Sequence, residues 1–322
     1  MKDIFFVGDF KNNNGPANVN KEIKKTLGTE KYCYSNSSGK LTRIVELVFK
    51  TISSRNICFC SFSKIDIIGI KICKILKKKT SYIMHGYIKK EQEINGERTK
   101  AIDDEKFILN NVNKIICVSE LCSEYIKQEG YPASIYYIYN NIPSVIPQHK
   151  NIKQENLIMS TGGLIPLKNN LKICEAIKKI NSSSKEQLIY VILGDSYNNK
   201  EQLKKYKFVR FYKCLPHDKC INLMQKTNLY IQNSKFETFG LSVIEALFEG
   251  CNILISKNVG AIGIFDNISS KSIIMDVDDI NEIASKIQYI LKHPNKNLIK
   301  KIDLKKMNQH EQLRQLVKII CS

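Results

Sequence analysis

Short β-rich segments alternate with segments of helical periodicity through the N-terminal half of the chain. The β-rich segments are Asp3–Gly8, Lys31–Tyr34, Asn56–Cys60, Thr80–Met84, Lys114–Val118 and Ser134–Ile138. The helical segments between them are Ala17–Leu27, Leu41–Ser53, Ile65–Lys77, Thr99–Asn111 and Glu120–Glu129. Strands that alternate with helices of this length are typical of βαβ units. The pattern therefore predicts an α/β fold with a parallel, doubly wound sheet.

The alternation is interrupted near the middle of the chain and then resumes. Turn-forming residues occupy Asn140–Pro143, and a polar stretch, Gln148–Gln154, follows, which together predict a linker. A chain of 322 residues also suits two domains of about 150 residues each. We therefore expect a Rossmann-like domain at residues 1–148 and a second at residues 149–322, which includes the C-terminal helices. Ligands of such sheets bind at the carboxyl ends of the strands, here facing a central cleft.

The chain is strongly basic, with a formal net charge of +19 that comes from 45 lysines and 5 arginines against 31 acidic residues. The excess is spread over both halves, at +8 before residue 148 and +11 after it. A nucleic-acid-binding protein more often concentrates arginine and aromatic residues in one stripe, so no nucleic-acid partner is expected. Solvated surface lysines explain the charge most simply, and attraction to anionic phosphates or to an anionic membrane face is the alternative.

The cysteines and the chain start indicate the cellular compartment. Eleven scattered cysteines form no CxxC pair, which favours reduced, buried thiols over a metal site or disulfides. Asp3 and Asp9 lie in the first ten residues, and no apolar segment with a small-residue cleavage site follows. The chain also lacks a run of about 20 apolar residues. We expect a cytoplasmic protein.

The segment Ser234–Gly250 contains the clearest chemical pattern. A strand is expected to end near Gln232 and a helix to begin at about Gly240, whose free amides and positive dipole end form an anion site for a phosphate. Glu245, about one and a half turns inside that helix, can accept hydrogen bonds from a diol such as a ribose. Glu237, in the loop, can reach a sugar beyond the phosphates. Taken alone, two surface glutamates that flank an amphipathic helix are the simpler interpretation.

The same segment resembles the Glu-x(7)-Glu signature of the retaining family 4 glycosyltransferases, particularly those that build bacterial surface polysaccharides. The matching positions are Ser234, Glu237, Phe239, Gly240, Leu241, Glu245, Ala246 and Gly250. The resemblance implies a GT-B fold, a nucleotide-sugar donor, most often a UDP-sugar, and retention of configuration without a cofactor or metal. It also implies that Glu245 holds the donor ribose and that Glu237 contacts the donor sugar near the reacting carbon. The distal phosphate would bind the amides of Thr238, Phe239, Gly240 and Leu241.

The segment Ser160–Asn169 is similar to the strand-to-helix element of the same family. Lys168 falls on the position of the lysine that binds the donor diphosphate, and a cation at a helix start suits a leaving diphosphate. Gly163 stands where the family usually has an arginine, so the usual pair of cations is incomplete. Lys168 then acts alone or with another lysine, for which Lys235 is a candidate.

Two features of the N-terminal half also match the family. His85 and Gly86 end a strand and open a polar loop, Tyr87–Arg98, where the family has a histidine that faces the transferred sugar. A lone histidine is otherwise usually structural. Asn14 and Gly15 lie in the first strand-to-helix loop, near which the family binds the donor phosphates. Helix capping around Pro16 is an equally good explanation for that loop.

Asp276-Val277-Asp278 spells the DxD motif with which another glycosyltransferase fold binds metal. Here it precedes a predicted helix at about Ile280–Leu291, for which Asp278 or Asp279 is a suitable N-cap. We therefore expect no metal site.

The sequence as a whole predicts a retaining, metal-independent glycosyltransferase of the hexosyl type. It would move a sugar from a nucleotide-diphosphate sugar to a glycan or lipid-linked acceptor. The alternatives are a nucleotide-sugar 2-epimerase of the same fold and a catalytically decayed nucleotide-sugar-binding protein.

One helical segment also raises the question of membrane contact. Isoleucines at 65, 68, 72 and 75 form a stripe within Ile65–Lys79, and lysines surround it. The stripe is either the core face of the helix or part of a surface that associates weakly with anionic membranes. The second interpretation places the protein peripherally on the inner face of the plasma membrane.

Overall fold

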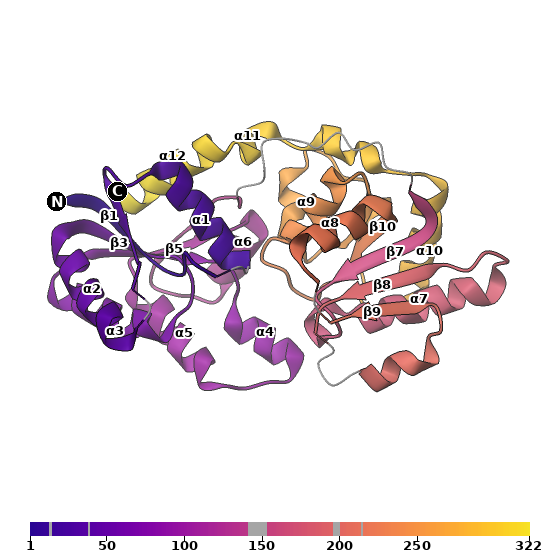
Figure 1. The fold of residues 1–322 in the computed structure, drawn as a ribbon, viewed down its shortest axis with the longest axis horizontal. Coiled ribbons are helices and arrows are strands. Elements are labelled where there is room, and N and C mark those ends of the chain that lie inside the picture. The colour runs from indigo at the N-terminus through magenta and orange to yellow at the C-terminus, as the bar shows by residue number, and fades with distance from the viewer. Residues whose placement is uncertain (13–14, 38, 141–152, 196–199, 214) are drawn as a thin grey trace. The chain divides into compact units, whose positions relative to one another are not determined.

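The computed structural model describes the chain except for residues 13–14, 38, 141–152, 196–199 and 214 (Figure 1). The predicted linker, Gln148–Gln154, therefore lies almost wholly outside the described residues. Two compact units are present. The first comprises Met1–Glu93, Glu97–Ser144 and Leu304–Ser322, and the second comprises Ile94–Gly96 and Val145–Asp303.

The first unit contains a six-stranded parallel sheet in the order β2-β1-β3-β4-β5-β6. The strands are β1 (Lys2–Val7), β2 (Tyr32–Tyr34), β3 (Ser54–Phe59), β4 (Lys79–Met84), β5 (Lys114–Cys117) and β6 (Ser134–Tyr137). The helices are α1 (Gly15–Leu27), α2 (Lys40–Ser53), α3 (Lys64–Ile75), α4 (Ile88–Asn95), α5 (Lys100–Asn111), α6 (Glu120–Gln128), α11 (Leu304–Met307) and α12 (Gln309–Cys321). Strand residues such as Ile4, Ile57 and Ile115 are fully buried, as expected where helices cover both faces of a parallel sheet.

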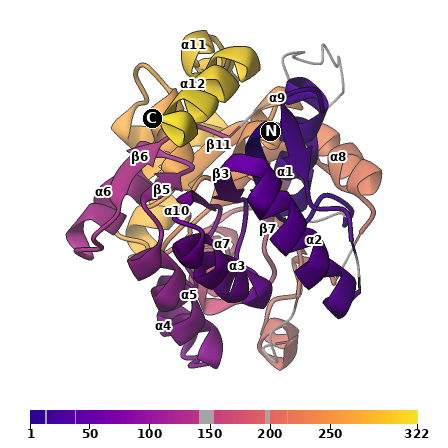
Figure 2. The same ribbon diagram turned by 90° about the vertical axis from the view of Figure 1, so that its left-hand side faces the viewer.

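The direction of the chain across the sheet decides which helices cover which face. The connection from β1 to β2 runs one way across the sheet, and the later connections run the other way. Because parallel crossovers are right-handed, α1 lies on the face opposite to α2, α3 and α5 (Figure 2). Helix α12 packs on the α1 face, against β1 and β3.

The position of α12 corrects the sequence-based assignment of residues 304–322 to the C-terminal domain. Leu313, Leu316 and Ile320 form an apolar stripe along α12 that is buried within the first unit. The amide of Tyr139 donates a hydrogen bond to the Gln312 side chain at 3.0 Å, and Lys114 Nζ donates one to the carbonyl of Ile319 at 2.6 Å. Helical periodicity reveals that α12 is amphipathic, but it does not identify the sheet that buries its stripe.

Helix α4 lies within Tyr87–Arg98, which the sequence predicts to be a polar loop. None of its residues is buried, so the apolar periodicity by which a helix is recognised is absent. Side chains from elsewhere stabilise its first turn instead. The Glu105 carboxylate accepts the amides of Ile88 and Lys89 at 3.1 and 3.0 Å. A carboxylate in this position satisfies unpaired amides of the helix start.

The second unit contains another six-stranded parallel sheet, in the order β12-β11-β10-β7-β8-β9. The strands are β7 (Gln154–Thr161), β8 (Ile189–Leu193), β9 (Val209–Tyr212), β10 (Thr227–Gln232), β11 (Asn252–Ser256) and β12 (Ile273–Ile274). The helices are α7 (Asn170–Ser183), α8 (His217–Lys226), α9 (Leu241–Phe248) and α10 (Ile280–Lys292). Short 3₁₀ turns cover Pro166–Lys168, Lys200–Lys205, Gly260–Ile264, Ser270–Ser272 and Lys296–Lys301. The predicted α/β class is confirmed in both units.

Among the described helices, none has the length and apolar character needed to cross a bilayer.

Glycines allow the backbone segments that follow β7 and β8 to approach closely and to form hydrogen bonds. Gly163 follows β7 with φ +65°, and Gly194 follows β8 with φ +133°. The amide of Gly163 donates to the carbonyl of Leu193 at 2.8 Å, and the amide of Leu164 donates to that of Asp195 at 2.8 Å. A Cβ atom at position 163 would lie 1.9 Å from the Asp195 carbonyl oxygen. The arginine usual at this position in the family is therefore sterically excluded here.

We expect Gly163→Ala to lower the free energy of unfolding by about 2–4 kcal/mol, because the new methyl group collides with backbone at a left-handed residue. Gly250→Ala is the matched control. Gly250 also has positive φ, at +78°, but its Cβ would meet a lysine side chain at an ordinary 3.6 Å. Urea unfolding of both variants measures the difference. Equal losses of stability would contradict the steric explanation.

Candidate functional site

Lys168 and Glu237 meet at the carboxyl ends of two paired strands. Lys168 ends the 3₁₀ turn that follows β7, and Glu237 lies in the loop that follows β10. Because β7 and β10 are neighbours in the sheet, their carboxyl ends lie side by side. The Lys168 ammonium forms an ion pair with Glu237 Oε2, and these side chains are only 20% and 16% exposed. The structure thus brings together two of the three predicted catalytic residues.

The backbone around Glu237 is fixed by an adjacent segment. Glu237 forms a parallel bridge with Val259, and its amide donates to the carbonyl of Asn258 at 3.0 Å. The amide of Gly260 donates to the Glu237 carbonyl, also at 3.0 Å. Phe236 and Phe239, on either side, are 7% and 1% exposed. The loop is therefore anchored at several points, which holds the Glu237 carboxylate at a defined position.

A network of polar side chains lies beneath Glu237, and sequence analysis did not identify it. Gln232 donates its side-chain amide to Glu237 Oε2 at 2.6 Å. The hydroxyl of Tyr230 lies 2.8 Å from that of Ser242 and 2.6 Å from that of Thr161. Thr161 and Gln232 end β7 and β10, Tyr230 lies two residues before the end of β10, and Ser242 is the second residue of α9. Their alternation with buried apolar residues at strand ends is the signal that could have revealed them.

Helix α9 begins beside this network at Gly240, as predicted. Gly240 has φ +96° and caps the helix without a side-chain hydrogen bond. A Cβ atom there would lie 3.0 Å from Val259 Cγ1, so the close approach of the loop also favours glycine. Thr238 is buried, and Leu241 is the first helical residue. The positive end of the helix dipole therefore lies at the edge of the sheet where Lys168 and Glu237 meet.

Glu245 lies one turn further along α9 and is largely buried. Burial raises its pKa, the nearby His217 opposes the rise, and Glu249 adds to it. A ligand that donates hydrogen bonds to this carboxylate would favour its ionised form. His217 is the first residue of α8, and the sequence indicated no role for it.

Lys235, the candidate second cation, forms an ion pair away from Glu237. Its ammonium lies 3.3 Å from Asp278 Oδ2. Asp278 also accepts a hydrogen bond from the side chain of Asn169, and Asp279 is the residue that caps α10. Among the described residues, no three histidine, cysteine, aspartate or glutamate side chains are arranged to hold a metal. Asp276 accepts the amide of Asp278 at 2.9 Å, so both aspartates of the DxD sequence make local contacts.

His85 directly follows β4 in the first unit. Burial lowers its pKa to about 4, and a hydrogen bond with the backbone of Cys60 opposes that shift. The imidazole is therefore neutral at pH 7 and can exchange hydrogen bonds without carrying charge. A Cβ atom at the next residue, Gly86, would lie 2.7 Å from Glu91 Oε1.

The first strand-to-helix loop is described in part. Asn14 lies outside the described residues. Gly15 begins α1, and a Cβ atom there would have no neighbour within 4 Å, so no steric reason requires glycine. The glycine with close neighbours is Gly8, where a Cβ would lie 3.0 Å from that of Cys60.

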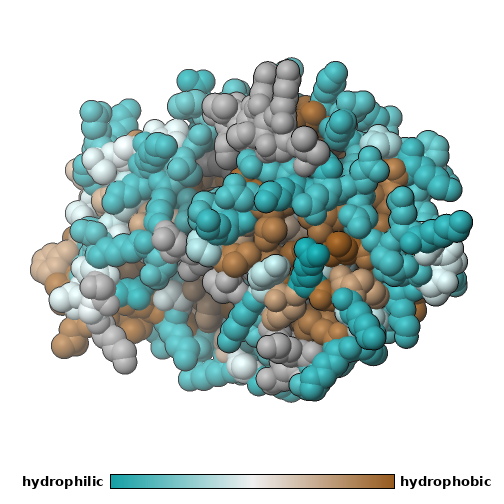
Figure 3. Space-filling model, turned by 45° about the vertical axis from the view of Figure 1, so that its right-hand side comes forward, coloured by the Kyte–Doolittle hydropathy of each residue, from teal (hydrophilic) through white to brown (hydrophobic). Residues whose placement is uncertain are grey.

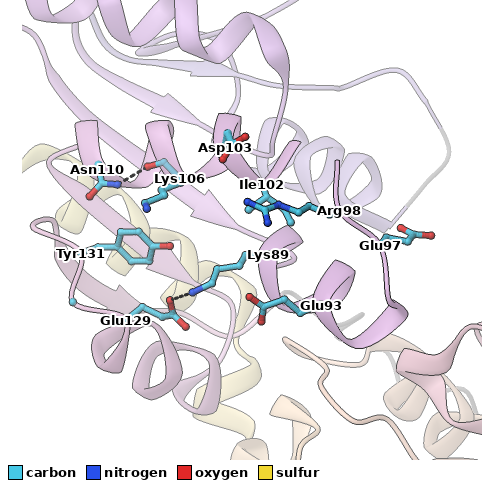
Figure 4. Close-up of a pocket in the computed structure, with 11 residues that line it drawn as sticks. Lys89, Glu93, Glu97, Arg98, Ile102, Asp103, Lys106, Asn110, Glu129 and Tyr131 are labelled. Carbon is cyan, nitrogen blue, oxygen red and sulfur yellow. Dashed lines mark hydrogen bonds and ion pairs between the residues drawn. The ribbon is translucent and has the colours of Figure 1, made fainter. Parts of the chain in front are cut away.

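A hollow of about 500 Å³ opens in the first unit between α4, α5 and the turn after α6 (Figure 4). Lys89 and Glu129 form an ion pair of 2.5 Å at its wall. Arg98, Asp103 and Tyr131 also line it. This hollow contains none of the predicted site residues. Its mixed charges and its hydroxyl group suit a polar ligand better than an apolar one.

Comparison with known proteins identifies the family to which the sequence is similar. The model of the glycosyl transferases group 1 family matches residues 142–307, which is more than half of the chain. The phosphatidylinositol N-acetylglucosaminyltransferase GPI3 subunit of Saccharomyces cerevisiae is 28% identical over 174 residues. That match covers 48% of this chain and 38% of the yeast protein, so the chain spans well under half the length of this relative.

Solved structures show the same fold across the whole chain. Anabaena HepE, in complex with UDP and glucose, has a TM-score of 0.72 at 15% identity and covers 99% of this chain and 100% of its own. WaaG, a glycosyltransferase involved in lipopolysaccharide biosynthesis, has a TM-score of 0.66 at 14% identity and covers 98% and 99%. The predicted GT-B fold is confirmed. On the match of the family model to more than half of its length, this chain belongs to the glycosyl transferases group 1 family.

Proposed function

We propose that this protein is a retaining glycosyltransferase that moves a hexosyl group from a nucleotide-diphosphate sugar, preferably a UDP-sugar, to an acceptor. The observation that carries the proposal is the Lys168–Glu237 ion pair beside the glycine-capped start of α9. A cation, a helix dipole and a carboxylate at one sheet edge match the parts of such a donor. The first two attract its diphosphate, and the carboxylate can hydrogen-bond its sugar.

The proposed chemistry follows the charge that develops as the donor's anomeric bond breaks. Negative charge grows on the leaving diphosphate, which Lys168 and the amides of residues 238–241 stabilise. Glu237 orients the donor sugar, and Glu245 holds the ribose. His85, which is neutral, would contact the transferred sugar by hydrogen bonding. No general base is assigned, because in this mechanism the leaving phosphate accepts the proton of the acceptor on the same face.

Lys168 changes its partner in this scheme. Without donor, the ammonium is neutralised by Glu237. A bound diphosphate competes for the ammonium and releases the Glu237 carboxylate toward the sugar. Gln232 still donates to Glu237 Oε2 at 2.6 Å and so limits how far the carboxylate moves.

The acceptor is proposed to be a glycan or a lipid-linked intermediate. The yeast relative is a subunit of a phosphatidylinositol N-acetylglucosaminyltransferase, and WaaG is involved in lipopolysaccharide biosynthesis, which supports this class of acceptor. We propose that the first unit binds it and that the polar hollow lined by Tyr131 and Arg98 contributes. A lipid-linked acceptor implies a cytoplasmic protein that is peripheral to the inner face of the membrane.

The two alternative functions make different products. A 2-epimerase would release nucleotide diphosphate or invert the sugar without any acceptor, and a decayed binding protein would bind the donor without turnover. Release of nucleotide diphosphate that depends on an acceptor distinguishes the proposed transferase from both.

Replacement of Glu245 and replacement of Glu237 should change different kinetic constants. Glu245→Ala should raise the KM for the donor by tenfold or more, on the order of the loss of a charged hydrogen bond, and change kcat little. Glu237→Ala should mainly lower kcat, because its carboxylate acts near the reacting carbon. Steady-state kinetics with the donor varied separates the two effects. Wild-type constants in both variants would refute the assignment.

Lys168→Ala should lower kcat/KM by roughly 10- to 150-fold, which corresponds to the loss of about 1.5–3 kcal/mol from a charged phosphate contact. Lys172→Ala is the matched control, because Lys172 pairs with Glu175 on the surface of α7, 3.1 Å away. An effect of Lys168→Ala under about threefold would indicate that a different cation stabilises the diphosphate.

Activity should persist in EDTA, because the described residues hold no acidic cluster with metal-ligand spacing. The check is the initial rate of transfer after exhaustive dialysis against the chelator. A loss of rate that magnesium or manganese restores would contradict metal independence.

A further inference from the structure

The outward face of α2 is apolar. Leu41, Val45 and Phe49 are 79%, 54% and 68% exposed, and Ile52 is 51% exposed. Spacings of four, four and three residues place them on one side of the helix. Leu47 and Thr51, on the opposite side, are buried. The first unit therefore buries one side of α2 and leaves this apolar side exposed.

The neighbouring helix α3 also exposes apolar side chains. Ile68 and Ile75 are 39% and 80% exposed, whereas the face that packs on the sheet contains Gly69, Ile70 and Cys73. Two members of the isoleucine stripe, Ile68 and Ile75, therefore lie on the outer side of α3 and not on its core face, whereas Ile65 and Ile72 are half-buried.

The two apolar surfaces adjoin. Helices α2 and α3 lie side by side (Figures 1 and 2) and pack where Gly69 meets Leu47. The polar flanks point away from the junction. Lys50 Nζ donates to the carbonyl of Tyr34 on β2 at 2.6 Å, and Lys71 Nζ lies 5.9 Å from the Phe107 ring of α5. The apolar side of each helix is thus the one nearer the other helix.

We call this surface the α2–α3 apolar face. Its members are Leu41, Val45, Phe49, Ile52, Ile68, Ile75 and Leu76. It holds seven of the fifteen large apolar side chains that the described residues expose, so these side chains are concentrated and not scattered. Apolar side chains, in brown, also reach the surface at the left margin of the space-filling view (Figure 3). Exposed apolar patches of this kind often mark surfaces that bind another protein or a membrane.

The chain around the α2–α3 apolar face is cationic. Residues 40–79 contain ten basic and two acidic residues. Both carboxylates are engaged: Glu46 pairs with Lys50 at 2.5 Å, and Asp66 is buried in the capping box of α3. Lys64 and Lys77 are exposed. Lys78 and Lys79 are held by the backbone carbonyls of Ser54 and Ser322. The field over the face is therefore positive.

We propose that the α2–α3 apolar face docks on an anionic phospholipid bilayer. Apolar side chains that enter the headgroup region, bordered by cations that attract anionic lipids, are the features of an interfacial helix. A second copy of the chain fits less well, because a two-fold interface would oppose two like-charged borders. The proposal refines the peripheral location given above and does not depend on the transfer reaction.

Flotation of the purified protein with vesicles tests the proposal. Wild type should float with vesicles of phosphatidylcholine and phosphatidylglycerol at low salt, and should float poorly with phosphatidylcholine alone or at high salt. Phe49→Ser combined with Ile75→Ser should lower the partition coefficient by tenfold or more, on the order expected for two buried apolar side chains. Leu304→Ser is the matched control, because Leu304 is 71% exposed and lies on α11. It should leave binding unchanged.

The cations are tested separately. Lys64→Gln combined with Lys77→Gln should weaken binding to anionic vesicles on the order of tenfold and reduce its salt dependence. Lys300→Gln combined with Lys301→Gln, in the second unit, is the control. Equal flotation of the apolar variant and wild type would overturn the proposal. So would a wild-type dimer, seen by sedimentation, that the apolar variant dissociates.

Titration of each variant with UDP keeps the two proposals distinct. Unchanged UDP affinity with lost flotation supports docking through the α2–α3 apolar face. Normal flotation by a wild type that binds no nucleotide would count against the transferase and leave the docking proposal supported.

Discussion

The parallel pairing of β7 with β10 is the constraint on which the candidate site depends. Lys168 and Glu237 are 69 residues apart in the chain, yet the pairing brings the ends of their strands to one edge of the sheet. The same pairing places Thr161 beside Tyr230 and so builds the polar network beneath the carboxylate. The loop of Glu237 is then held on its other side by Val259 and Gly260, which follow β11. Strand order and loop anchoring together give a partly buried charge pair next to the start of α9.

The close backbone contact between Gly163 and Asp195 restricts which side chains can stand at the same edge of the sheet. Close backbone contact between the loops after β7 and β8 leaves no room for a side chain at position 163. The departure from the family pattern is therefore built into the backbone and is not a simple exchange of one side chain. In the structure the Lys235 ammonium lies 3.3 Å from Asp278, and the Lys168 ammonium is the one that pairs with Glu237. The proposed diphosphate contact is therefore assigned to Lys168.

The sequence predicted those features that depend on local periodicity and on a contiguous motif. Alternating strands and helices identify both sheets, and the segment around Glu237 and Gly240 identifies the loop and helix start. Features that depend on distant contacts could not be predicted in this way. Helix α4 has no buried face and is held by Glu105, and α12 returns to the first sheet through contacts such as Lys114 with Ile319. Gln232 reaches Glu237 only because the loop folds back over its own strand. The isoleucine stripe of α3 was open to two interpretations, because periodicity records which side chains share a side, not what covers them.

Thermal unfolding in the presence of nucleotides and nucleotide sugars tests most directly the proposal that the second unit binds a nucleotide-diphosphate sugar. A ligand that binds the native state raises its stability by about 2.7 kcal/mol at a concentration 100 times its Kd. We expect a saturable rise in Tm with one nucleotide diphosphate, strongest for UDP, and a comparable or larger rise with its sugar conjugate. Nucleoside monophosphates should act more weakly, because they lack the phosphate that Lys168 and the start of α9 are proposed to hold. A folded protein whose Tm does not change with any nucleotide diphosphate or nucleotide sugar would contradict donor binding at Lys168 and the start of α9.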